Sequence, residues 1–322
     1  MLYRNTFINE NLRIKVYTRS KRISQLINNF LDFNNTCYSK SQIKIDFYLD
    51  EVNLKNTEKE GDDSKRFLCR GWLQRNNNLS LSLGNTIANV IASPETNVVK
   101  GEIFKFDESL KERILDFVFT QPLQFILAYH SLFFLHSSML CKNNDCILIL
   151  GEQNAGKSTL ALVLSRSFDL LADDDCFIKP TNNGIVLYPF PTKMGLKDKV
   201  LNRYPELKKH ILKNYRYGGK HRLSLNSISS NSNHPGARRC KMIIFPRYRE
   251  GEKVCLKEMS REEALDRLTD NSSRYPKEKA QEAFWALCSL TKGANSFKLS
   301  YDDEQLDEIP KIIQEAFNRC YN

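Results

Sequence analysis

Residues 147–164, ILILGEQNAGKSTLALVL, contain the residue pattern with the clearest chemical meaning in the chain. An apolar run ends at a glycine, the pattern G-x-x-x-x-G-K-[ST] follows, and a helical pattern begins at its end. A short loop at a helix N-terminus directs backbone N–H groups at one point, where the helix dipole adds partial positive charge. The pattern therefore predicts a phosphate-binding loop for a nucleotide, formed by Gly151, Glu152, Gln153, Asn154, Ala155, Gly156, Lys157, Ser158 and Thr159.

Two residues of this loop have specific expected roles. Lys157 would reach the β- and γ-phosphates, and the hydroxyl of Ser158 would bind Mg²⁺. A magnesium site also needs a carboxylate, and Asp173, Asp174 and Asp175 follow an apolar stretch shortly after the loop. Successive strand residues face opposite ways, so these three cannot face one metal ion unless the strand ends there. The simpler interpretation is a solvated acidic turn.

Further candidate residues lie close to this region in the sequence. His136 lies shortly before the strand that leads into the loop, although a lone histidine is more often a packed or surface residue. No G-x-S-x-G pattern supports a Ser-His-Asp hydrolase. Lys193 and Lys197 follow the acidic stretch closely, so we expect them to contact phosphate or substrate.

Residues 197–222 form a basic segment with nine Lys or Arg and two acidic residues. Interleaved tyrosines and the pair Gly218-Gly219 favour a hinged clamp for phosphate, substrate or another acidic partner. A solvated basic helix fits the same composition. So does a surface for single-stranded nucleic acid, because bases stack on aromatic rings beside basic groups.

The composition is that of a folded chain of one or two domains: 322 residues, 41% hydrophobic and 27% charged. A net charge of +10 favours an acidic partner. The nine cysteines are odd in number and show no C-x-x-C spacing, which predicts reduced thiols and a cytoplasmic location. The polar opening residues predict no signal peptide. The apolar window 114–135 contains several polar residues, so we expect a buried helix there and no membrane partner.

The pattern of elements predicts two domains, a β-rich α+β domain over 1–110 and an α/β domain over 111–322. In the first, alternation predicts strands at 13–18, 42–49, 66–74 and 79–83, with an exposed loop at 56–65. A helix follows over 108–130, with Pro122 as a kink or break. The second is expected to contain a hairpin of 133–142 with 145–150, the loop and its helix, strands at 168–180, 184–190, 241–248 and 297–301, a flexible loop at 226–241, and helices from Ser260, at 276–290 and at 306–320.

The combination LHSSML…DCILILGEQNAGKSTLALVLSRSFDLLADDDCFI resembles the catalytic core of the HPr kinase/phosphorylase family and its HPr-kinase-related relatives, which share a phosphoenolpyruvate carboxykinase-like P-loop fold. The family pattern is a strand with a histidine, a hairpin, the phosphate loop, a helix, and a strand that ends in Ala/Ser-Asp-Asp. His136, Gly151 to Thr159 and Ala172-Asp173-Asp174 match it in order. The resemblance covers residues 130–200 well and the remainder to the C-terminus weakly.

This resemblance implies an ATP- and Mg²⁺-dependent kinase that acts on a hydroxyl group, because relatives phosphorylate serine in peptides or as the free amino acid. By analogy Asp173 would help to hold Mg²⁺, Asp174 would take the proton of the attacking hydroxyl, and His136 would be oriented against Asp174. The expected catalytic residues are therefore Asp174, His136 and Lys157. A homo-oligomer is also implied.

One departure from the family narrows this expectation. The E-I-R-G-L-G-type signature of true HPr kinases is absent, and the basic segment occupies its region. We therefore expect a relative and not an HPr kinase itself. Two other functions stay open: a P-loop ATPase or nucleotide-gated binding module without a phosphoryl acceptor, and a nucleic-acid-binding or nucleic-acid-modifying protein. An ABC-type ATPase is disfavoured, because no LSGGQ-like segment appears.

Overall fold

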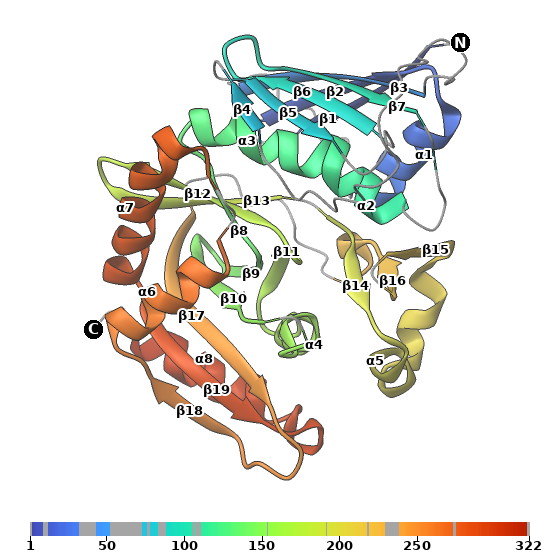
Figure 1. Ribbon diagram of the computed structural model, residues 1–322. Coiled ribbons are helices and arrows are strands. Elements are labelled where there is room, and N and C mark those ends of the chain that lie inside the picture. The colour runs from blue at the N-terminus through green and yellow to red at the C-terminus, as the bar shows by residue number, and fades with distance from the viewer. Residues whose placement is uncertain are drawn as a thin grey trace, which may run out of the picture. The chain divides into compact units, whose positions relative to one another are not determined.

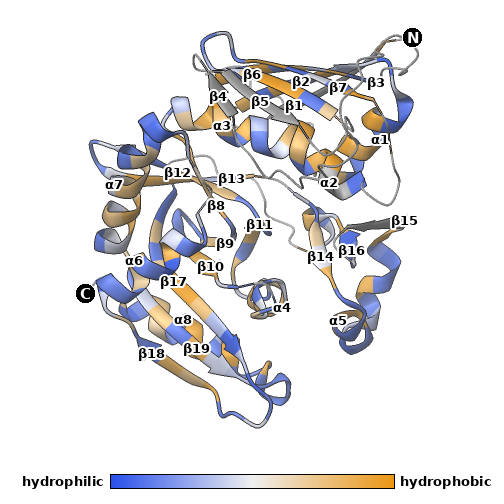
Figure 2. Cartoon of the chain, in the orientation of Figure 1, coloured by the Kyte–Doolittle hydropathy of each residue, from blue (hydrophilic) through white to orange (hydrophobic). Residues whose placement is uncertain are grey.

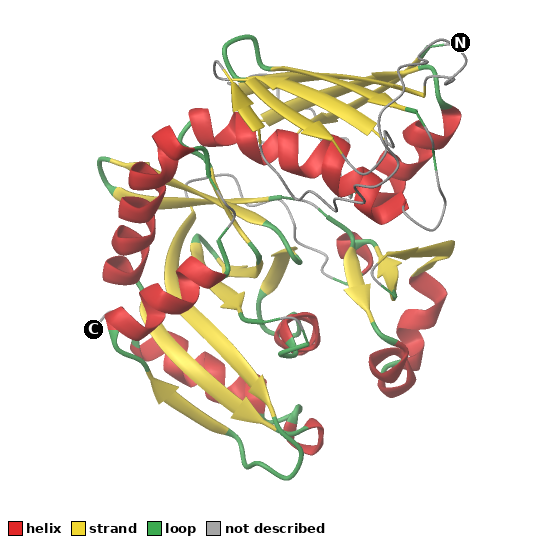
Figure 3. Ribbon diagram, viewed as in Figure 1, coloured by secondary structure: helices red, strands yellow, loops and turns green. Residues whose placement is uncertain are grey.

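The chain folds into a mixed α/β structure, which confirms the expected class at that level (Figures 1 and 3). It divides into two compact units, Met1–His130 and Ser131–Asn322. The computed structural model describes residues 2–8, 12–31, 43–51, 73–75, 78–82, 88–104, 106, 111–152, 154–190, 192–217, 219–228, 238–272 and 275–320.

A seven-stranded sheet forms the first unit, and the helices of that unit cover one of its faces (Figure 1). Leu12, Ile14 and Val16 are buried, while Arg13 and Lys15 between them are partly exposed. This alternation is typical of strands covered on one face. Helix α1 (Lys21–Phe30) begins after a serine cap. Across the sheet the strands are β1 (Tyr3–Ile8), β2 (Leu12–Thr18), β3 (Ile43–Glu51), β7 (Val98–Ile103), β6 (Ala88–Ser93), β5 (Asn78–Ser82) and β4 (Leu73–Arg75).

The strands expected at 13–18 and 42–49 are confirmed as β2 and β3. The one expected at 79–83 agrees with β5, which extends over Asn78–Ser82. The expected loop at 56–65 and most of the expected strand at 66–74 lie outside the described residues.

The last part of the first unit is one helical stretch around Pro122. It consists of α2 (Lys111–Leu115), a π-helical turn (Asp116–Thr120) and α3 (Gln121–Tyr129). Proline lacks an N–H, and the wider turn before it absorbs the missing hydrogen bond without ending the helix. Phe119 in this turn packs on Phe47 of β3, with ring centroids 4.8 Å apart. This helix packs on the first sheet, and the first compact unit ends at His130, whereas we expected a domain boundary near residue 110.

The expected buried helix covers the apolar window 114–135 only as far as Tyr129, and Leu123 and Phe125 of α3 are both 1% exposed; residues 133–135 form strand β8 instead. Among the residues that the structure describes, no helix combines the length and the apolar character needed to cross a bilayer.

The second unit is built on a nine-stranded sheet. Three of its strands, β10, β17 and β19, run parallel to one another, so their carboxyl ends meet at one edge. The hairpin expected around residues 143–144 is confirmed by the pairing of Lys142 with Asp145. The order is β11 (Asp169–Ala172), β9 (Ser137–Lys142), β10 (Asp145–Leu150), β17 (Arg238–Tyr248), β13 (Gly184–Pro189), β12 (Cys176–Thr181) and β8 (Phe133–Leu135), with β19 (Asn295–Tyr301) paired to β17 and β18 (Cys255–Glu258) paired to β19.

Helices cover both faces of this sheet. On one face α4 (Lys157–Leu164) and α8 (Ile309–Arg319) share a hydrophobic core with β10, β17 and β19, to which Met242 and Ile244 contribute. Ile243 and Phe245 alternate with them and face α7 (Lys277–Gly293) and α6 (Arg261–Asp270), where Arg267 lies over the ring of Phe245. The apolar stretches of β17 stand out in Figure 2.

A smaller antiparallel sheet contains most of the basic segment. It consists of β14 (Met194–Leu196), β16 (Lys220–Leu223) and β15 (Ile211–Tyr217). Helix α5 (Asp198–Arg203) and a 3₁₀ turn (Pro205–His210) connect β14 to β15. Residues 197–222 therefore form a helix, a turn and two strands and not one solvated basic helix. The middle of the flexible loop expected at 226–241, residues 229–237, lies outside the described residues.

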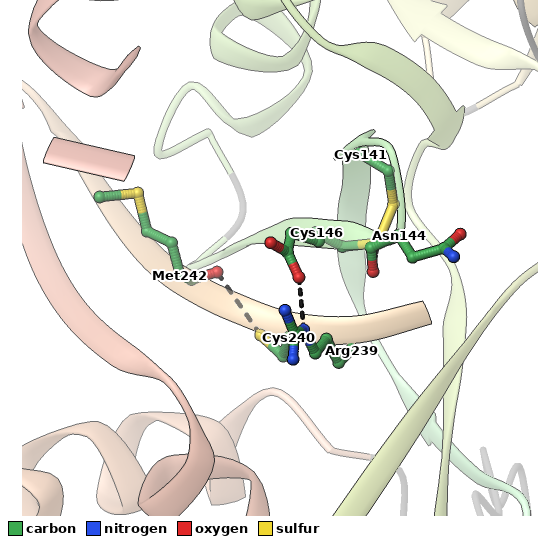
Figure 4. The surroundings of a disulfide bond; sticks show 7 residues. Cys141, Asn144, Cys146, Arg239, Cys240 and Met242 are labelled. Carbon is green, nitrogen blue, oxygen red and sulfur yellow. Dashed lines mark hydrogen bonds and ion pairs between the residues drawn. A yellow bond between two sulfur atoms is a disulfide. The ribbon is translucent and has the colours of Figure 1, made fainter. Parts of the chain in front are cut away.

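Cys141 and Cys146 form a disulfide across the β9–β10 hairpin, as Figure 4 shows. They are register partners with Cα atoms 4.1 Å apart, as in a non-hydrogen-bonded antiparallel pair. The expectation of reduced thiols is wrong for this pair, because the two-residue turn at 143–144 brings both side chains level with each other. Cys240 of β17 is the next partner across the sheet, and its buried thiol donates to the carbonyl of Met242.

Candidate functional site

The loop between β10 and α4 has a backbone that only certain residues can adopt. Gly151 has φ +154°, Asn154 φ +70° and Gly156 φ +94°. A Cβ atom on Gly156 would lie 2.1 Å from the hydroxyl oxygen of Tyr301, so glycine is required there for space as well as for conformation. Gln153, also expected in this loop, lies outside the described residues.

Lys157 is the first residue of α4, and its side chain turns back over the loop. The Nζ atom donates to the carbonyl oxygens of Gly151 at 2.7 Å and Glu152 at 3.1 Å. The residue is only 7% exposed. Burial lowers the pKa of this amine, and the charge of Asp174, which favours the ammonium form, does not fully offset it. Ser158 and Thr159 follow on the first turn, both partly buried.

Segments 133–142 and 168–180, each expected as one strand, are both interrupted, and the two interruptions lie beside each other in the sheet. Residues 133–142 form β8 and β9, separated by His136, and residues 168–180 form β11 and β12, separated by 173–175. On both sides of the interruption the two segments pair with each other, β9 with β11 and β8 with β12. Their other neighbours in the sheet differ, because β10 lies beside β9 and β13 lies beside β12. Asp174 has φ +72°, a left-handed conformation that ends a strand.

The register between these two segments nevertheless continues across the interruption. Met139 pairs with Ala172 on one side, and Leu135 pairs with Cys176 on the other. Three residues lie between the two paired positions on each segment, 136–138 on one and 173–175 on the other, so these residues stay level with one another. His136 is thereby brought opposite Asp175.

Asp173 is fully buried and held through each of its oxygens. Ser138 donates its hydroxyl to Oδ1 at 2.7 Å, and the N–H of Gly195 donates to Oδ2 at 3.2 Å. The hydroxyl of Thr192 donates to its backbone carbonyl. Burial, together with the negative charge of Asp174, raises the pKa of Asp173 to about 6.

Asp174 has the opposite electrostatic environment. Burial alone would raise its pKa, but the positive charges of Lys220, Arg222, His136 and Lys157 outweigh that effect and lower it. Arg222 lies closest, with Nη1 3.4 Å from Oδ2. Two adjacent carboxylates thus have pKa values shifted in opposite directions, which is typical of functional sites.

The expected orientation of His136 against Asp174 is corrected, because the partner is Asp175. His136 Nδ1 lies 3.9 Å from Asp175 Oδ1, and the histidine side chain is 44% exposed. The continued register, which aligns His136 with Asp175, explains this choice. Burial alone would lower the pKa of His136, but the interaction with the carboxylate of Asp175 and the negative charge of Asp174 outweigh burial and raise it.

Lys220 and Arg222 are site residues that the sequence analysis did not single out. They lie two residues apart on β16 and therefore face the same way. Gly195, the register partner of Arg222 on β14, leaves room for both: a Cβ there would lie 2.9 Å from Lys220 Cδ and 3.0 Å from Arg222 Nη1. Arg222 also donates to the carbonyl of Lys193 at 2.7 Å. In the sequence, the alternation of Lys220 and Arg222 in a short strand could have indicated that both cations face the same way.

The two lysines expected to contact phosphate or substrate have different positions. Lys197 Nζ donates to Oδ1 of Asn154 in the loop, at 2.6 Å, which brings the basic segment to the loop. Lys193 is buried, and its backbone carbonyl supports Arg222. The structure thus brings the loop, the acidic stretch and the basic segment together within one unit.

Comparisons with known proteins do not show a family for this chain. No protein-family model and no curated protein matches the chain. Among solved structures, one described as "Structure of the Hpr(Ser) kinase/phosphatase from Coxiella burnetii" is similar, with 14% sequence identity and a TM-score of 0.32. The match covers 59% of this chain and 99% of that chain. A similarity at these values shows no family for this chain.

The site's chemistry follows from its geometry. A lysine at the N-terminus of a helix, with the N–H groups of the loop beside it, can bind an anion such as a phosphate. A carboxylate kept ionised by neighbouring cations can accept a proton or a hydrogen bond. These groups lie in one cluster, since the charges of Lys157, Lys220 and Asp174 act on one another.

Proposed function

We propose that this protein is an ATP- and Mg²⁺-dependent kinase with an HPr-kinase-like, phosphoenolpyruvate carboxykinase-type P-loop domain. It transfers the γ-phosphoryl group to a hydroxyl of a peptide, a protein or a small molecule. One observation carries the proposal. An ionised carboxylate, Asp174, sits in a left-handed turn within electrostatic reach of Lys157 of the glycine-rich loop and of Arg222. A module that only holds a nucleotide has no need of that carboxylate.

The donor side of the reaction uses the loop at residues 151–158. Its N–H groups and Lys157 would bind the β- and γ-phosphates, with Lys157 exchanging its bonds to the carbonyls of Gly151 and Glu152 for phosphate oxygens. Lys197, at the loop through Asn154, would add positive charge there.

A magnesium ion is implied by the resemblance, and the residues present fit one. Mg²⁺ commonly uses one or two protein carboxylates together with substrate phosphates. Asp173, with a pKa raised to about 6 beside a second carboxylate, gains from a nearby cation. Asp173 and the hydroxyl of Ser158 would hold the ion, which when bound neutralises phosphate charge. Among the described residues no group of three or more ligating side chains forms an all-protein metal site.

On the acceptor side Asp174 receives the proton. The acceptor oxygen forms a bond to the γ-phosphorus, the bond from that phosphorus to the β–γ bridging oxygen breaks, and ADP leaves. The hydroxyl proton passes to the carboxylate of Asp174. A weak base suffices, because the transition state of phosphoryl transfer is loose and the hydroxyl loses its proton late. Lys220 and Arg222 keep Asp174 ionised, and the pair of His136 with Asp175 borders it.

The test is a transfer assay with ATP labelled in its γ-phosphoryl group. Cell lysate, separated into protein, nucleic-acid and small-molecule fractions, supplies the acceptors. Asp174→Asn is the inactive variant, expected to bind ATP but not to transfer. Asp145→Asn is the matched control, because Asp145 lies at the far end of β10, paired with Arg239. Lys157→Ala should abolish ATP binding.

A labelled acceptor that appears with wild type and Asp145→Asn, but not with Asp174→Asn, supports the kinase and identifies its substrate class. Free labelled phosphate with no labelled acceptor would instead make the protein an ATPase. Transfer by Asp174→Asn at the wild-type rate would remove Asp174 from its proposed role.

A further inference from the structure

The carboxyl ends of three parallel strands form an edge beside the loop. In open α/β sheets, ligands bind outside such ends. Strand β10 leaves the sheet after Leu150, whereas β17 continues for four residues beyond Ile244, the partner of Ile149. At its end Tyr248 pairs in register with Tyr301, the last residue of β19. The two tyrosines therefore lie side by side at this edge.

Tyr301 fixes this pair to the loop. Its hydroxyl donates to the carbonyl oxygen of Gly156 at 3.4 Å, and the residue is almost fully buried. The ring of Tyr248 packs against it edge to face, with centroids 6.1 Å apart and an interplanar angle of 69°. Tyr248 remains partly exposed. An accessible aromatic ring thus stands next to the start of α4, on the side of the loop away from Asp173.

Polar groups with both donors and acceptors surround the ring of Tyr248. Lys199 of α5 has its Nζ 5.1 Å from the ring centroid and 3.4 Å from the tyrosine hydroxyl. The same Nζ lies 2.5 Å from Oδ2 of Asp303. Lys199 is largely exposed, so it can move away from the ring at little cost.

We infer that Tyr248, Lys199 and Asp303 form a binding site for the purine base of a nucleotide whose phosphates occupy the 151–158 loop. The base stacks on Tyr248, in the place that the ammonium group of Lys199 takes over the ring. Asp303 then accepts a hydrogen bond from the exocyclic amino group of adenine. The inference rests on the proposed function, because the loop must hold the phosphates.

The experiment compares two probes, ATP and inorganic tripolyphosphate, which has the phosphates without the base. Calorimetric titration of the full-length protein measures both dissociation constants for wild type, Tyr248→Ala, Tyr248→Phe and Lys157→Ala. Trp285→Ala is the matched control, because Trp285 is an exposed aromatic residue on α7, which covers the other face of the sheet.

Base–aromatic stacking is worth about a tenfold change in affinity or more. We expect Tyr248→Ala to weaken ATP binding about tenfold and to leave tripolyphosphate binding unchanged, while Tyr248→Phe and Trp285→Ala retain wild-type values for both. Unchanged tripolyphosphate binding also shows that Tyr248→Ala is folded. As a second measurement on unmodified protein, 8-azido-ATP should label the segments around Tyr248 or Asp303.

Three results would overturn the inference. Equal weakening of both probes by Tyr248→Ala, together with labelling elsewhere, would make Tyr248 a support for the loop. No effect of Tyr248→Ala on ATP, while Lys157→Ala still abolishes binding, would refute the base site and leave the proposed function intact. Failure of wild type to bind either probe would refute both.

Discussion

Replacement of Gly156 by alanine should damage the loop through two separable effects. The residue has φ +94°, and the new Cβ would lie 2.1 Å from the hydroxyl oxygen and 3.3 Å from Cζ of Tyr301. A left-handed backbone costs an L-residue about 1–2 kcal/mol, and overpacking costs about 1–3 kcal/mol. We therefore expect Gly156→Ala to lower the free energy of unfolding by about 2–5 kcal/mol.

Gly184 separates the two effects. It has φ +104° at the tip of the β12–β13 hairpin, and an added Cβ would have no atom within 4 Å. Gly184→Ala should therefore cost only the backbone strain of about 1–2 kcal/mol. Tyr301→Phe removes the hydroxyl that the new Cβ would meet, so the double variant Gly156→Ala/Tyr301→Phe should recover most of the steric cost.

The assay is denaturant-dependent hydrogen exchange, read by mass spectrometry in peptides from β10 and β17. This readout reports on the unit that carries the loop and not on the first unit. A cost of Gly156→Ala equal to that of Gly184→Ala would refute the steric argument. A cost that persists in the Tyr301→Phe background would show that Tyr301 is not the obstacle.

Three further predictions concern other parts of the second unit. Gly195→Ala should lower the rate of phosphoryl transfer about tenfold or more, because it displaces the two cations beside it. Stability should also fall, by about 1–3 kcal/mol, since the buried side chain of Arg222 must move. A wild-type rate would count against the cation cluster. Reduction of the disulfide between Cys141 and Cys146 should lower the free energy of unfolding by about 2 kcal/mol for so short a closed loop, measured by urea titration with and without dithiothreitol, with no effect of the reductant on a Cys141→Ala/Cys146→Ala variant. Because the pKa of His136 is raised in the folded state, its stabilisation is complete below about pH 6.5 and is lost as the pH rises through the folded-state pKa. The stability difference between wild type and His136→Gln should therefore shrink as the pH rises above about 6.5, and a growing difference would contradict the ion pair.

Local patterns in the sequence were sufficient for most elements of the second unit. The hairpin turn at 143–144, the helix after the loop and the cap at Ser260 depend on neighbouring residues only. The cap is confirmed by the hydrogen bond from the N–H of Glu263 to the Ser260 hydroxyl, at 3.1 Å. Such features follow from turn chemistry and capping, which act over a few residues.

The features that sequence reasoning missed depend on which segments become neighbours. The split of 168–180 into two strands depends on distant neighbours, because β11 lies at the sheet edge beside β9 while β12 lies between β13 and β8, and no local pattern records this. The positions of Lys220 and Arg222 depend on the pairing of β16 with β14. The disulfide could have been inferred from the predicted hairpin, since the hairpin register makes Cys141 the partner of Cys146.

The interrupted pairing between segments 133–142 and 168–180 limits how this sequence can change in evolution. Because the register continues from Met139–Ala172 to Leu135–Cys176, chain length between these positions determines which side chains meet. Deletion of one residue from either segment would move each following side chain to the opposite face of the sheet. Insertions at the tip around 182–183 leave that count untouched. We therefore expect divergent relatives that retain this chemistry to vary in length at the hairpin tip, while the two short spacers through His136 and Asp174 keep theirs.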